Sequence, residues 1–221
     1  MRAAEVALPA ARPVKDPTLD VELGCFSTGA ALVIGIDEVG RGAIAGPVAV
    51  GVHAVLAGTV EFPEGLRDSK LLSEKKREAL APVVGEWGSG AVGFATAEEI
   101  DARGITAMLG EAARRALLEL HLAGVPVDRA VILLDGSHDW LSPALRRPLD
   151  VRTRVGADRA CASVSAASIR AKVARDELMR AADAEHPGYA WASNKGYGAK
   201  AHYEGIATLG LTALHRRTWI R

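Results

Sequence analysis

Residues 32–47 of the chain read LVIGIDEVGRGAIAGP. The apolar run Leu32–Asp37 predicts a buried β-strand, and the apolar pattern that resumes over Pro47–Val55 predicts a second one. The glycines between the two runs indicate a tight connection, because glycine adopts turn conformations that other residues avoid. Two acids, Asp37 and Glu38, therefore stand where the first strand meets the turn.

The rest of the chain alternates between strand-like and helix-like patterns. Three more strands are predicted at Ala91–Ala95, Val131–Asp135 and Leu149–Val155. Helices are predicted at Thr18–Cys25, Ser73–Glu86, Thr106–Ala123, Ala162–Ala184 and Ala199–Thr208. This order predicts one α/β domain with a mixed sheet flanked by helices, plus a small helical C-terminal element. Residues 1–17 are rich in alanine and proline and are expected to form a flexible tail.

The composition argues against membrane and secreted proteins. No apolar run is long enough to cross a membrane, and charged residues interrupt the N-terminus, so no secretory signal is expected. Cys25 and Cys161 lack the spacing of metal ligands or of a disulfide framework. Two buried free thiols in a cytoplasmic protein are the simplest interpretation.

Charge is distributed unevenly although the formal net charge is +0. Residues 146–221 contain 14 lysines and arginines against 7 acids, whereas residues 1–145 contain 13 against 20. A basic C-terminal third is compatible with a polyanion that lies along one side of the molecule. Charged faces are usually just solvated, so the asymmetry by itself is weak evidence.

Acids stand at the ends of several predicted strands. Asp37 and Glu38 end the first strand, Asp135 ends the fourth, and Asp158 follows the fifth. Burying a carboxylate is costly unless a cation or hydrogen bonds compensate, and carboxylates are preferred ligands of Mg²⁺ and Mn²⁺. Any single acid is explained as well by a loop cap or a salt bridge. Four of them favour a site for two divalent ions acting on a phosphodiester.

Asp37 and Glu38 raise a geometric question. Adjacent strand residues point to opposite faces, so both side chains cannot point inward in a regular strand. Either the strand is irregular there, or one residue contributes through its backbone carbonyl or a water. We expect Asp37 to be the ligand that both ions share.

Eight short blocks of sequence carry a further signal. They are Gly35–Pro47, Asp68–Arg77, Leu133–Gly136, Gly156–Asp158, Ser165–Asp176, His186–Tyr189, Lys195–Tyr197 and His215–Arg216. In this order, from about residue 18 to the C-terminus, they resemble the bacterial ribonuclease HII family, the type 2 ribonucleases H.

The resemblance implies a ribonuclease H-like fold, with a catalytic domain over residues 18–185 and a substrate-binding contribution from residues 186–221. It implies an endoribonuclease that hydrolyses the RNA strand of RNA–DNA hybrids and cuts 5′ of single ribonucleotides in duplex DNA. Cleavage would use two ions, Mg²⁺ or Mn²⁺, and would leave 3′-hydroxyl and 5′-phosphate ends. The implied roles are ribonucleotide excision repair and removal of RNA primers.

The resemblance also assigns residues to roles. The catalytic, metal-binding acids fall on Asp37, Glu38, Asp135 and Asp158. The motif Gly40, Arg41 and Gly42 is expected to grip the 2′-hydroxyl of the ribonucleotide and its adjoining phosphate, since glycines let a backbone approach closely. Tyr197 matches a junction-sensing tyrosine whose ring would pack on the following deoxyribose. The alternative is an ordinary half-buried tyrosine.

Other residues in the matching blocks are expected to support the site. Asp68, Ser69 and Lys70 are assigned to contacts with the nucleic-acid backbone or to support of the acids. Ser168 and Lys172 lie one helical turn apart, on a face that would meet phosphates. The alternative is a serine and a lysine on the helix surface. Asp176 has ion-pair spacing to both Lys172 and Arg180, and is interpreted as structural.

The chain departs from the family pattern at a few positions. Asn194 stands where a histidine is frequent, which puts the local support of Tyr197 in question. Asp139 lies in an unusual loop, and we expect it to cap that loop rather than approach the metals. No sliding-clamp peptide is recognised, and a monomer is expected.

Two other functions compete with this interpretation. A nuclease or recombinase of the same fold that cuts DNA would offer no 2′-hydroxyl for Gly40, Arg41, Gly42 and Tyr197 to recognise. A non-catalytic binder of RNA–DNA hybrids would be expected to have lost at least one of the four acids, and none is lost.

Overall fold

The structure is a computed structural model in which residues 16–220 are described. The tail expected over residues 1–17 falls almost entirely outside this range. No helix within the range has both the length and the apolar character required to cross a membrane.

A five-stranded mixed sheet forms the centre of the fold, in the order β3-β2-β1-β4-β5. The strands are β1 (Leu32–Val39), β2 (Val48–Leu56), β3 (Gly90–Ala95), β4 (Val131–Asp135) and β5 (Asp150–Arg154). Antiparallel pairing joins β1 to β2 and β2 to β3, whereas β1, β4 and β5 are parallel to one another. The five predicted strands and the mixed sheet are confirmed.

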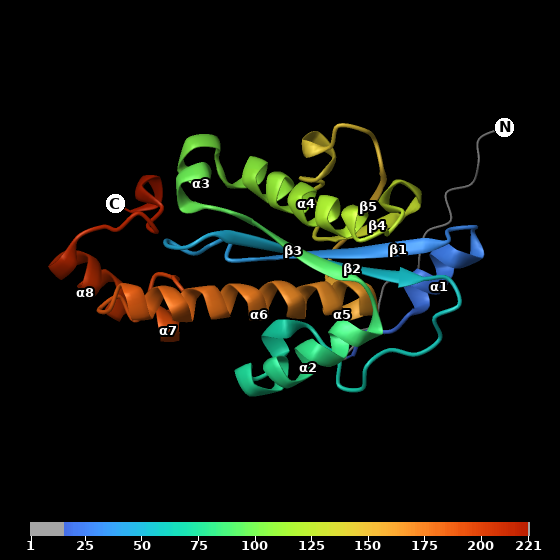
Figure 1. Ribbon diagram of the computed structural model, residues 1–221, viewed down its shortest axis with the longest axis horizontal. Coiled ribbons are helices and arrows are strands. Elements are labelled where there is room, and N and C mark those ends of the chain that lie inside the picture. Colours follow the sequence, from blue (N-terminus) through green and yellow to red (C-terminus); the bar gives the residue numbers. More distant parts are fainter. Residues whose placement is uncertain (1–15, 221) are drawn as a thin grey trace.

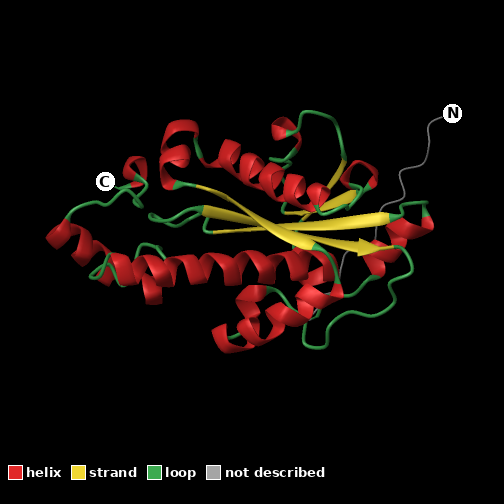
Figure 2. Ribbon diagram, in the orientation of Figure 1, coloured by secondary structure: helices red, strands yellow, loops and turns green. Residues whose placement is uncertain are grey.

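Helices cover both faces of the sheet (Figure 1). On one face α4 (Ile105–Leu122) packs against β2 and β3, and on the other the long α6 (Ala162–Glu185) runs along β1 and β2. Figure 2 shows the strands as a middle layer between these helices. The remaining α-helices are α1 (Asp20–Ser27), α2 (Glu74–Trp87), α3 (Ala97–Arg103), α5 (Ala157–Ala160), α7 (Trp191–Asn194) and α8 (Lys200–Leu209).

The helix predictions are confirmed to within a few residues, but they omit three short helices, α3, α5 and α7. Ser73 begins α2 as predicted, since its hydroxyl accepts a hydrogen bond from the Lys76 amide. The sequence predictions lack α3, which has only seven residues and follows β3 directly. Its signal is the reciprocal capping box of Thr96 and Glu99.

The alternation of side chains along β1 decides which residues face which layer. Leu32, Ile34 and Ile36 belong to the large apolar cluster under α4, whereas Val33 packs in a separate cluster with residues of α6. Asp37 is four residues after Val33 in the same strand, so the two side chains point to the same face of the sheet. The Asp37 side chain therefore lies on the face that α6 covers. The strand pattern thus places one carboxylate in the layer between the sheet and α6.

Candidate active site

The strand is regular where Asp37 and Glu38 occur. Pairing with β2 continues through Val39 and Ala49, so the two side chains point to opposite faces and an irregular strand is excluded. Asp37 is 3% exposed and accepts a hydrogen bond of 2.8 Å from the Glu38 amide. The Glu38 carboxylate lies 3.5 Å from the Arg41 guanidinium. Both acids lie inside β1, which extends two residues further than predicted, to Val39.

Two other segments bring acids to the same end of the sheet. The parallel register that pairs Ile36 with Leu134 places Asp135 beside Asp37. Asp135 accepts hydrogen bonds from the amides of Ala157 (2.7 Å) and Asp158 (3.4 Å), and so it caps the first turn of α5. Asp158 is buried within that turn. Three segments that are distant in the sequence therefore contribute the four acids.

Lys70 places an ammonium group among these acids. Its Nζ atom lies 3.2 Å from Oδ2 of Asp158. Burial lowers the pKa of Lys70, but the charges of Asp37, Asp68 and Asp158 outweigh that effect and raise the pKa above its ordinary value. The side chain therefore remains a cation and partly neutralises the acids.

The acids are nevertheless short of positive charge. Burial raises the pKa of Asp37 well above its ordinary value, and the charges of Glu38 and Asp135 raise it further. Burial also raises the pKa values of Glu38 and Asp135, and the charge of Asp158 adds to the effect on Asp135. A divalent cation would relieve this repulsion, and carboxylate oxygens are its preferred ligands, so the donor set fits Mg²⁺ or Mn²⁺.

The carboxylates are not already gathered around a single point. Within residues 16–220, no three His, Cys, Asp or Glu side chains converge closely enough to hold a metal ion. Glu38 is engaged with Arg41, Asp158 with Lys70, and Asp135 with backbone amides of α5. Metal binding at this site therefore requires side chains to turn away from these partners.

The segment Asp68–Lys70 packs against α6 next to Asp37. Ser168 on α6 is buried, donates to the Ser69 hydroxyl (2.7 Å) and lies beside Asp37, whose pKa it lowers against the larger effect of burial. Asp68 accepts from the Lys70 amide (3.0 Å), and its second oxygen forms an ion pair with Arg159 at 3.5 Å without hydrogen-bond geometry. The alternative of a surface serine at position 168 is wrong, because this serine lies under the site.

Lys172 points along its helix and not outward. Its ammonium lies 2.6 Å from Oδ1 of Asp176, and the lysine side chain is 17% exposed. Asp176 takes its second ion pair from Arg77 at 3.7 Å. The predicted pairing of Asp176 with Arg180 is wrong, because Arg180 is drawn to Glu74 and Glu78 of α2. The structural interpretation of Asp176 fits both of its ion pairs.

The loop after β1 meets the C-terminal element. The Gly40 amide donates a hydrogen bond of 3.2 Å to the hydroxyl of Tyr197, which is 157 residues away in the sequence. Arg41 is half exposed, and Tyr197 is 38% exposed. A Cβ atom added to Gly42 would meet nothing within 4 Å, so the protein itself does not require glycine there. Arg41, Gly42 and Tyr197 are therefore accessible at the surface, and the buried Gly40 joins the motif to the tyrosine.

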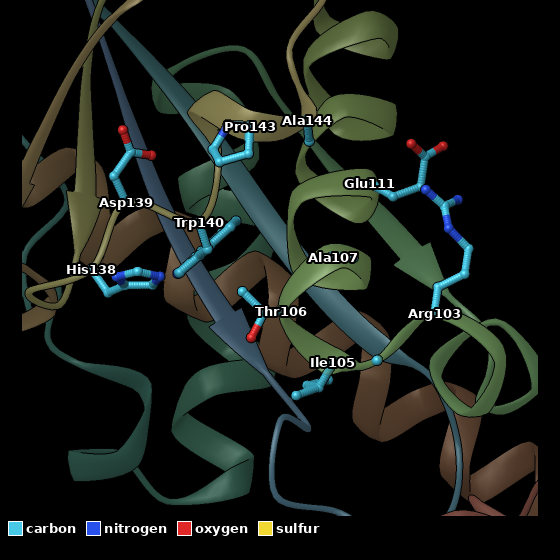
Figure 3. A pocket seen from close by; sticks show the side chains of 11 residues that line it. Arg103, Ile105, Thr106, Ala107, Glu111, His138, Asp139, Trp140, Pro143 and Ala144 are labelled. Atoms are coloured by element: carbon cyan, nitrogen blue, oxygen red, sulfur yellow. The ribbon is translucent and has the colours of Figure 1, made fainter.

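A cleft of ≈ 760 Å³ lies between the start of α4 and the loop that follows β4 (Figure 3). Figure 3 shows Ile105 and Thr106 on the α4 side and His138 and Trp140 on the loop side. None of the residues predicted for the site lines this cleft. Asp139 accepts hydrogen bonds from the amides of Leu141 (3.0 Å) and Ser142 (2.9 Å), which confirms that it caps the loop.

Comparison with known proteins identifies the family. The family model described as Ribonuclease HII matches residues 34–221. The chain is 44% identical to Ribonuclease HII of Streptomyces avermitilis over 209 residues, which cover 94% of this chain and 85% of the relative. It is 41% identical to Ribonuclease HII of Paracoccus denitrificans over 205 residues, or 92% and 91% of the two chains. The chain belongs to the ribonuclease HII family.

Solved structures agree with this family in fold. The ribonuclease H2 of Pyrococcus horikoshii OT3 superposes with a TM-score of 0.65 at 25% identity and covers 85% of this chain and 93% of its own. A PCNA:RNase HII complex from Archaeoglobus fulgidus gives a TM-score of 0.65 at 26% identity, with coverage of 86% and 96%. The ribonuclease H-like fold is thereby confirmed.

Membership of the ribonuclease HII family defines the general activity. The chain is a metal-dependent endoribonuclease of the ribonuclease H type, which hydrolyses the RNA strand of RNA–DNA hybrids. The four acids at the ends of β1 and β4 and in α5 are the chemically suitable place for that reaction.

Sequence reasoning on the ribonuclease HII blocks missed two arginines. Arg175 and Arg216 are both 0% exposed, although both stand inside blocks that carry the resemblance. A signal was present for Arg175, because Ala171 and Met179, one helical turn to either side, are apolar and buried. For Arg216 no local pattern separates a buried guanidinium from a solvated one.

Asn194 supports Tyr197 in spite of its departure from the family pattern. Its side chain donates to the Tyr189 carbonyl (2.7 Å) and accepts from the Gly196 amide (2.8 Å). The Tyr197 amide donates to the Asn194 carbonyl (2.9 Å), and the Tyr197 carbonyl lies 2.9 Å from Nδ1 of His202. The turn that carries Tyr197 is therefore hydrogen-bonded on both sides.

Proposed function

We propose that this protein cuts duplex DNA on the 5′ side of single embedded ribonucleotides, with two divalent ions, Mg²⁺ or Mn²⁺, and leaves 3′-hydroxyl and 5′-phosphate ends. In the cell this reaction removes ribonucleotides from DNA and contributes to removal of RNA primers. A ribonuclease HIII with a TM-score of 0.66 at 23% identity, covering 97% of this chain and 73% of its own, is described as a complex with Mn²⁺. That description supports a divalent ion here.

The four acids Asp37, Glu38, Asp135 and Asp158 hold the ions in this proposal. Because β1 is regular, Glu38 contributes through its backbone carbonyl or a water. Bound divalent ions supply Lewis-acid activation of water and of the scissile phosphate. The chain's own contribution is to hold the carboxylates in place, with Ser168 against Asp37 and the α5 amides on Asp135. Lys70 favours the ionised form of the acids around it, which is the form that binds cations.

The hydrogen bond between Gly40 and Tyr197 is the observation that carries the proposal. It joins the Gly40-Arg41-Gly42 loop to the tyrosine, so a single nucleotide step can contact both. The space in front of Gly42 lets a sugar approach the backbone, where the 2′-hydroxyl distinguishes RNA from DNA. Arg41 supplies a charge for the adjoining phosphate. Residues 186–221 thus contribute to substrate binding, and residues 18–185 carry the acids.

A gel assay with three end-labelled substrates tests the proposal. The substrates are duplex DNA with one ribonucleotide, the same duplex without it, and a long RNA–DNA hybrid, each with Mg²⁺ or Mn²⁺. We expect cleavage 5′ of the single ribonucleotide and no cleavage of the all-DNA duplex. Failure to cut the first substrate with either ion would overturn the proposal, and cleavage of the all-DNA duplex would favour a DNA nuclease.

A further inference from the structure

We propose that Arg175 and Arg216 are positioning residues for the recognition loop, defined as residues Gly40–Pro47. Their two buried guanidinium groups hold the carbonyls of this loop inward, so that free amides remain for the substrate. The inference rests on the proposed function, because it takes the recognition loop to contact the ribonucleotide.

Arg216 holds the two ends of the recognition loop together. Its guanidinium donates to the carbonyls of Gly40 (2.7 Å) and Arg41 (2.9 Å) at the start of the loop. It also donates to the Gly46 carbonyl from Nε (3.2 Å) and Nη2 (3.1 Å). One planar side chain therefore fixes the orientation of three peptide groups.

Arg175 holds the rest of the loop and connects it to the turn of Tyr197. It donates to the carbonyls of Pro47 (2.8 Å) and Ala45 (3.2 Å). Its third bond, of 2.8 Å, goes to the Lys195 carbonyl, and its guanidinium lies 5.6 Å from the centre of the Tyr197 ring. The same arginine thus sets the distance between the loop and the tyrosine.

The recognition loop packs closely against the guanidinium of Arg175. Gly40 has a φ of +82°, and a Cβ atom at this position would lie 2.1 Å from Nε of Arg175. A glycine is therefore required at position 40 by the guanidinium beneath it. Gly42 faces no such neighbour, which leaves its outer side free.

With the carbonyls bound, two adjacent amides remain available. Across the described part of the chain, the amides of Arg41 and Gly42 donate to no protein group, whereas the Gly40 amide donates to Tyr197. Consecutive free amides at a turn form a site for an anion or a hydroxyl oxygen. The recognition loop therefore presents hydrogen-bond donors to a phosphate or to a 2′-hydroxyl.

The two arginines also bring positive charge that the protein leaves unbalanced. All their hydrogen bonds go to carbonyls, and neither forms an ion pair with a carboxylate within residues 16–220. Burial lowers the pKa of Arg175, and burial and the charge of Arg175 lower the pKa of Arg216 to about 10, so Arg216 remains a cation at neutral pH. The guanidinium of Arg175 is also a cation, because arginine is not deprotonated in proteins. Buried charges are costly without a partner. A substrate phosphate at the loop would supply the missing negative charge.

Arg170 on α6, the helix that also carries Arg175, offers a matched control. Like the other two it donates to backbone carbonyls, those of Val84 (3.0 Å) and Gly88 (2.7 Å), and its Nε donates to His53. These partners lie at the end of α2 and on β2, and none of them belongs to the recognition loop. Arg170→Met therefore removes a similar set of bonds without touching the site.

The test compares wild type, Arg216→Met, Arg216→Lys and Arg170→Met on the single-ribonucleotide duplex and on the long hybrid. For Arg216→Met we expect KM for the first substrate to rise about tenfold, more than kcat falls, with a smaller preference over the hybrid. Arg216→Lys keeps the positive charge but loses the planar guanidinium with its several N–H donors. Its KM and preference should therefore lie between those of wild type and Arg216→Met. Arg170→Met should lower Tm while KM and the preference stay at wild-type values.

The outcomes separate this inference from the proposed function. If wild type cuts the single-ribonucleotide duplex but Arg216→Met changes KM and the preference no more than Arg170→Met does, the positioning role is wrong. If wild type does not cut that duplex, the proposed function itself fails. Should Arg216→Met fail to fold by circular dichroism, Arg216→Lys decides: a wild-type KM and preference would overturn the inference.

Discussion

Asp37 combines burial with close negative neighbours, which makes its charge unfavourable for the folded state. Its pKa is raised well above the ordinary value by burial, Glu38 and Asp135. A group whose pKa is raised on folding stabilises the protein while it is protonated, and that contribution is lost as the pH rises through the folded-state pKa. At neutral pH and without divalent ions, Asp37 therefore contributes less to stability than it does at low pH, where it is protonated in both the folded and the unfolded chain.

We predict that Asp37→Asn abolishes cleavage without loss of stability. The amide keeps the shape of the side chain but cannot serve as an anionic ligand, so Mg²⁺-dependent cleavage should fall about a thousandfold or more. In the absence of divalent ions at pH 7, Tm should equal or exceed that of wild type. Gel assays and thermal melts measure the two effects, and Asp135→Asn should also lose cleavage. Cleavage at the wild-type rate by either variant would rule out the two-metal interpretation.

Two of the three glycines in the recognition loop, Gly40 and Gly42, should respond differently to alanine. Gly40→Ala places Cβ against Arg175 in a positive-φ conformation, which should cost about 1–3 kcal/mol of unfolding free energy. Gly42→Ala meets open space, so the unfolding free energy should change by less than about 0.5 kcal/mol. Cleavage of the single-ribonucleotide duplex should nevertheless fall about tenfold in Gly42→Ala, because Cβ occupies the path of the sugar. Urea denaturation and the gel assay check both variants; full activity in Gly42→Ala would contradict close approach of the substrate.

At the scale of elements, α6 is the helix that connects the site to the rest of the molecule. Ser168 reaches Asp37, Arg175 reaches the recognition loop, and Arg170 reaches α2 and β2. These three side chains leave α6 at different points along its length, and each satisfies buried polar groups on another element. A rigid helix thus fixes the position of the recognition loop relative to the acids.

His53 is a buried neutral group at the junction of three elements. It lies on β2, stacks on Trp87 of α2 with ring centres 4.7 Å apart, and accepts from Arg170 of α6 at 3.1 Å. Burial and, to a smaller extent, the charge of Arg170 together lower its pKa to about 3. Because the unfolded chain binds the proton more readily, stability is full above about pH 6.5 and is lost as the pH falls toward 3.

We therefore predict a pH-dependent loss of stability that His53 controls. Below about pH 6.5 this histidine should remove about 1.4 kcal/mol of unfolding free energy per pH unit. Urea denaturation at pH 7, 6 and 5 measures the dependence, and His53→Gln should show a shallower one, whatever its absolute stability. Parallel curves for wild type and variant would show that His53 does not stay neutral in the folded protein.

The elements were largely predictable from the sequence, but their contacts were not. Apolar runs such as Val131–Asp135 mark strands because hydrophobic periodicity is local information. The regular pairing through Val39 is set by β2, and the partner of Arg180 is set by α2, so neither follows from the pattern around the residue itself. Among site residues, the resemblance assigned the acids and Tyr197, whereas the buried state of Arg175 and Arg216 depends on segments that pack from elsewhere.

At the scale of the whole molecule, the basic C-terminal third contributes the side chains that meet the recognition loop. Tyr197 and Arg216 both belong to this third: Arg216 is buried beneath the loop, whereas Tyr197 and, from the acidic part, Arg41 are exposed at the surface. The excess of basic residues in the C-terminal third of the sequence thus places positive side chains around the recognition loop. Binding of a polyanion at such a surface should weaken with salt, because each phosphate contact releases counterions.

We predict that Arg41→Ala reduces the salt dependence of binding. In an Asp135→Asn background, which permits binding without cleavage, the slope of log K against log salt for the single-ribonucleotide duplex should become shallower by about one. Fluorescence anisotropy across a salt series measures the slope. A slope identical to that of the background protein would mean that Arg41 makes no phosphate contact, and its role would then be limited to its ion pair with Glu38.

The position of Arg216 has a consequence for the order in which the enzyme matures during synthesis. All four acids, and the whole recognition loop, leave the ribosome long before residue 216 does. Until then the carbonyls of Gly40, Arg41 and Gly46 lack the donor that orients them in the finished structure. A nascent chain or a degradation fragment that ends before Arg216 would thus carry a complete set of acids without a formed recognition loop. Under the function proposed for the loop, discrimination between RNA and DNA would be the last property acquired and the first lost.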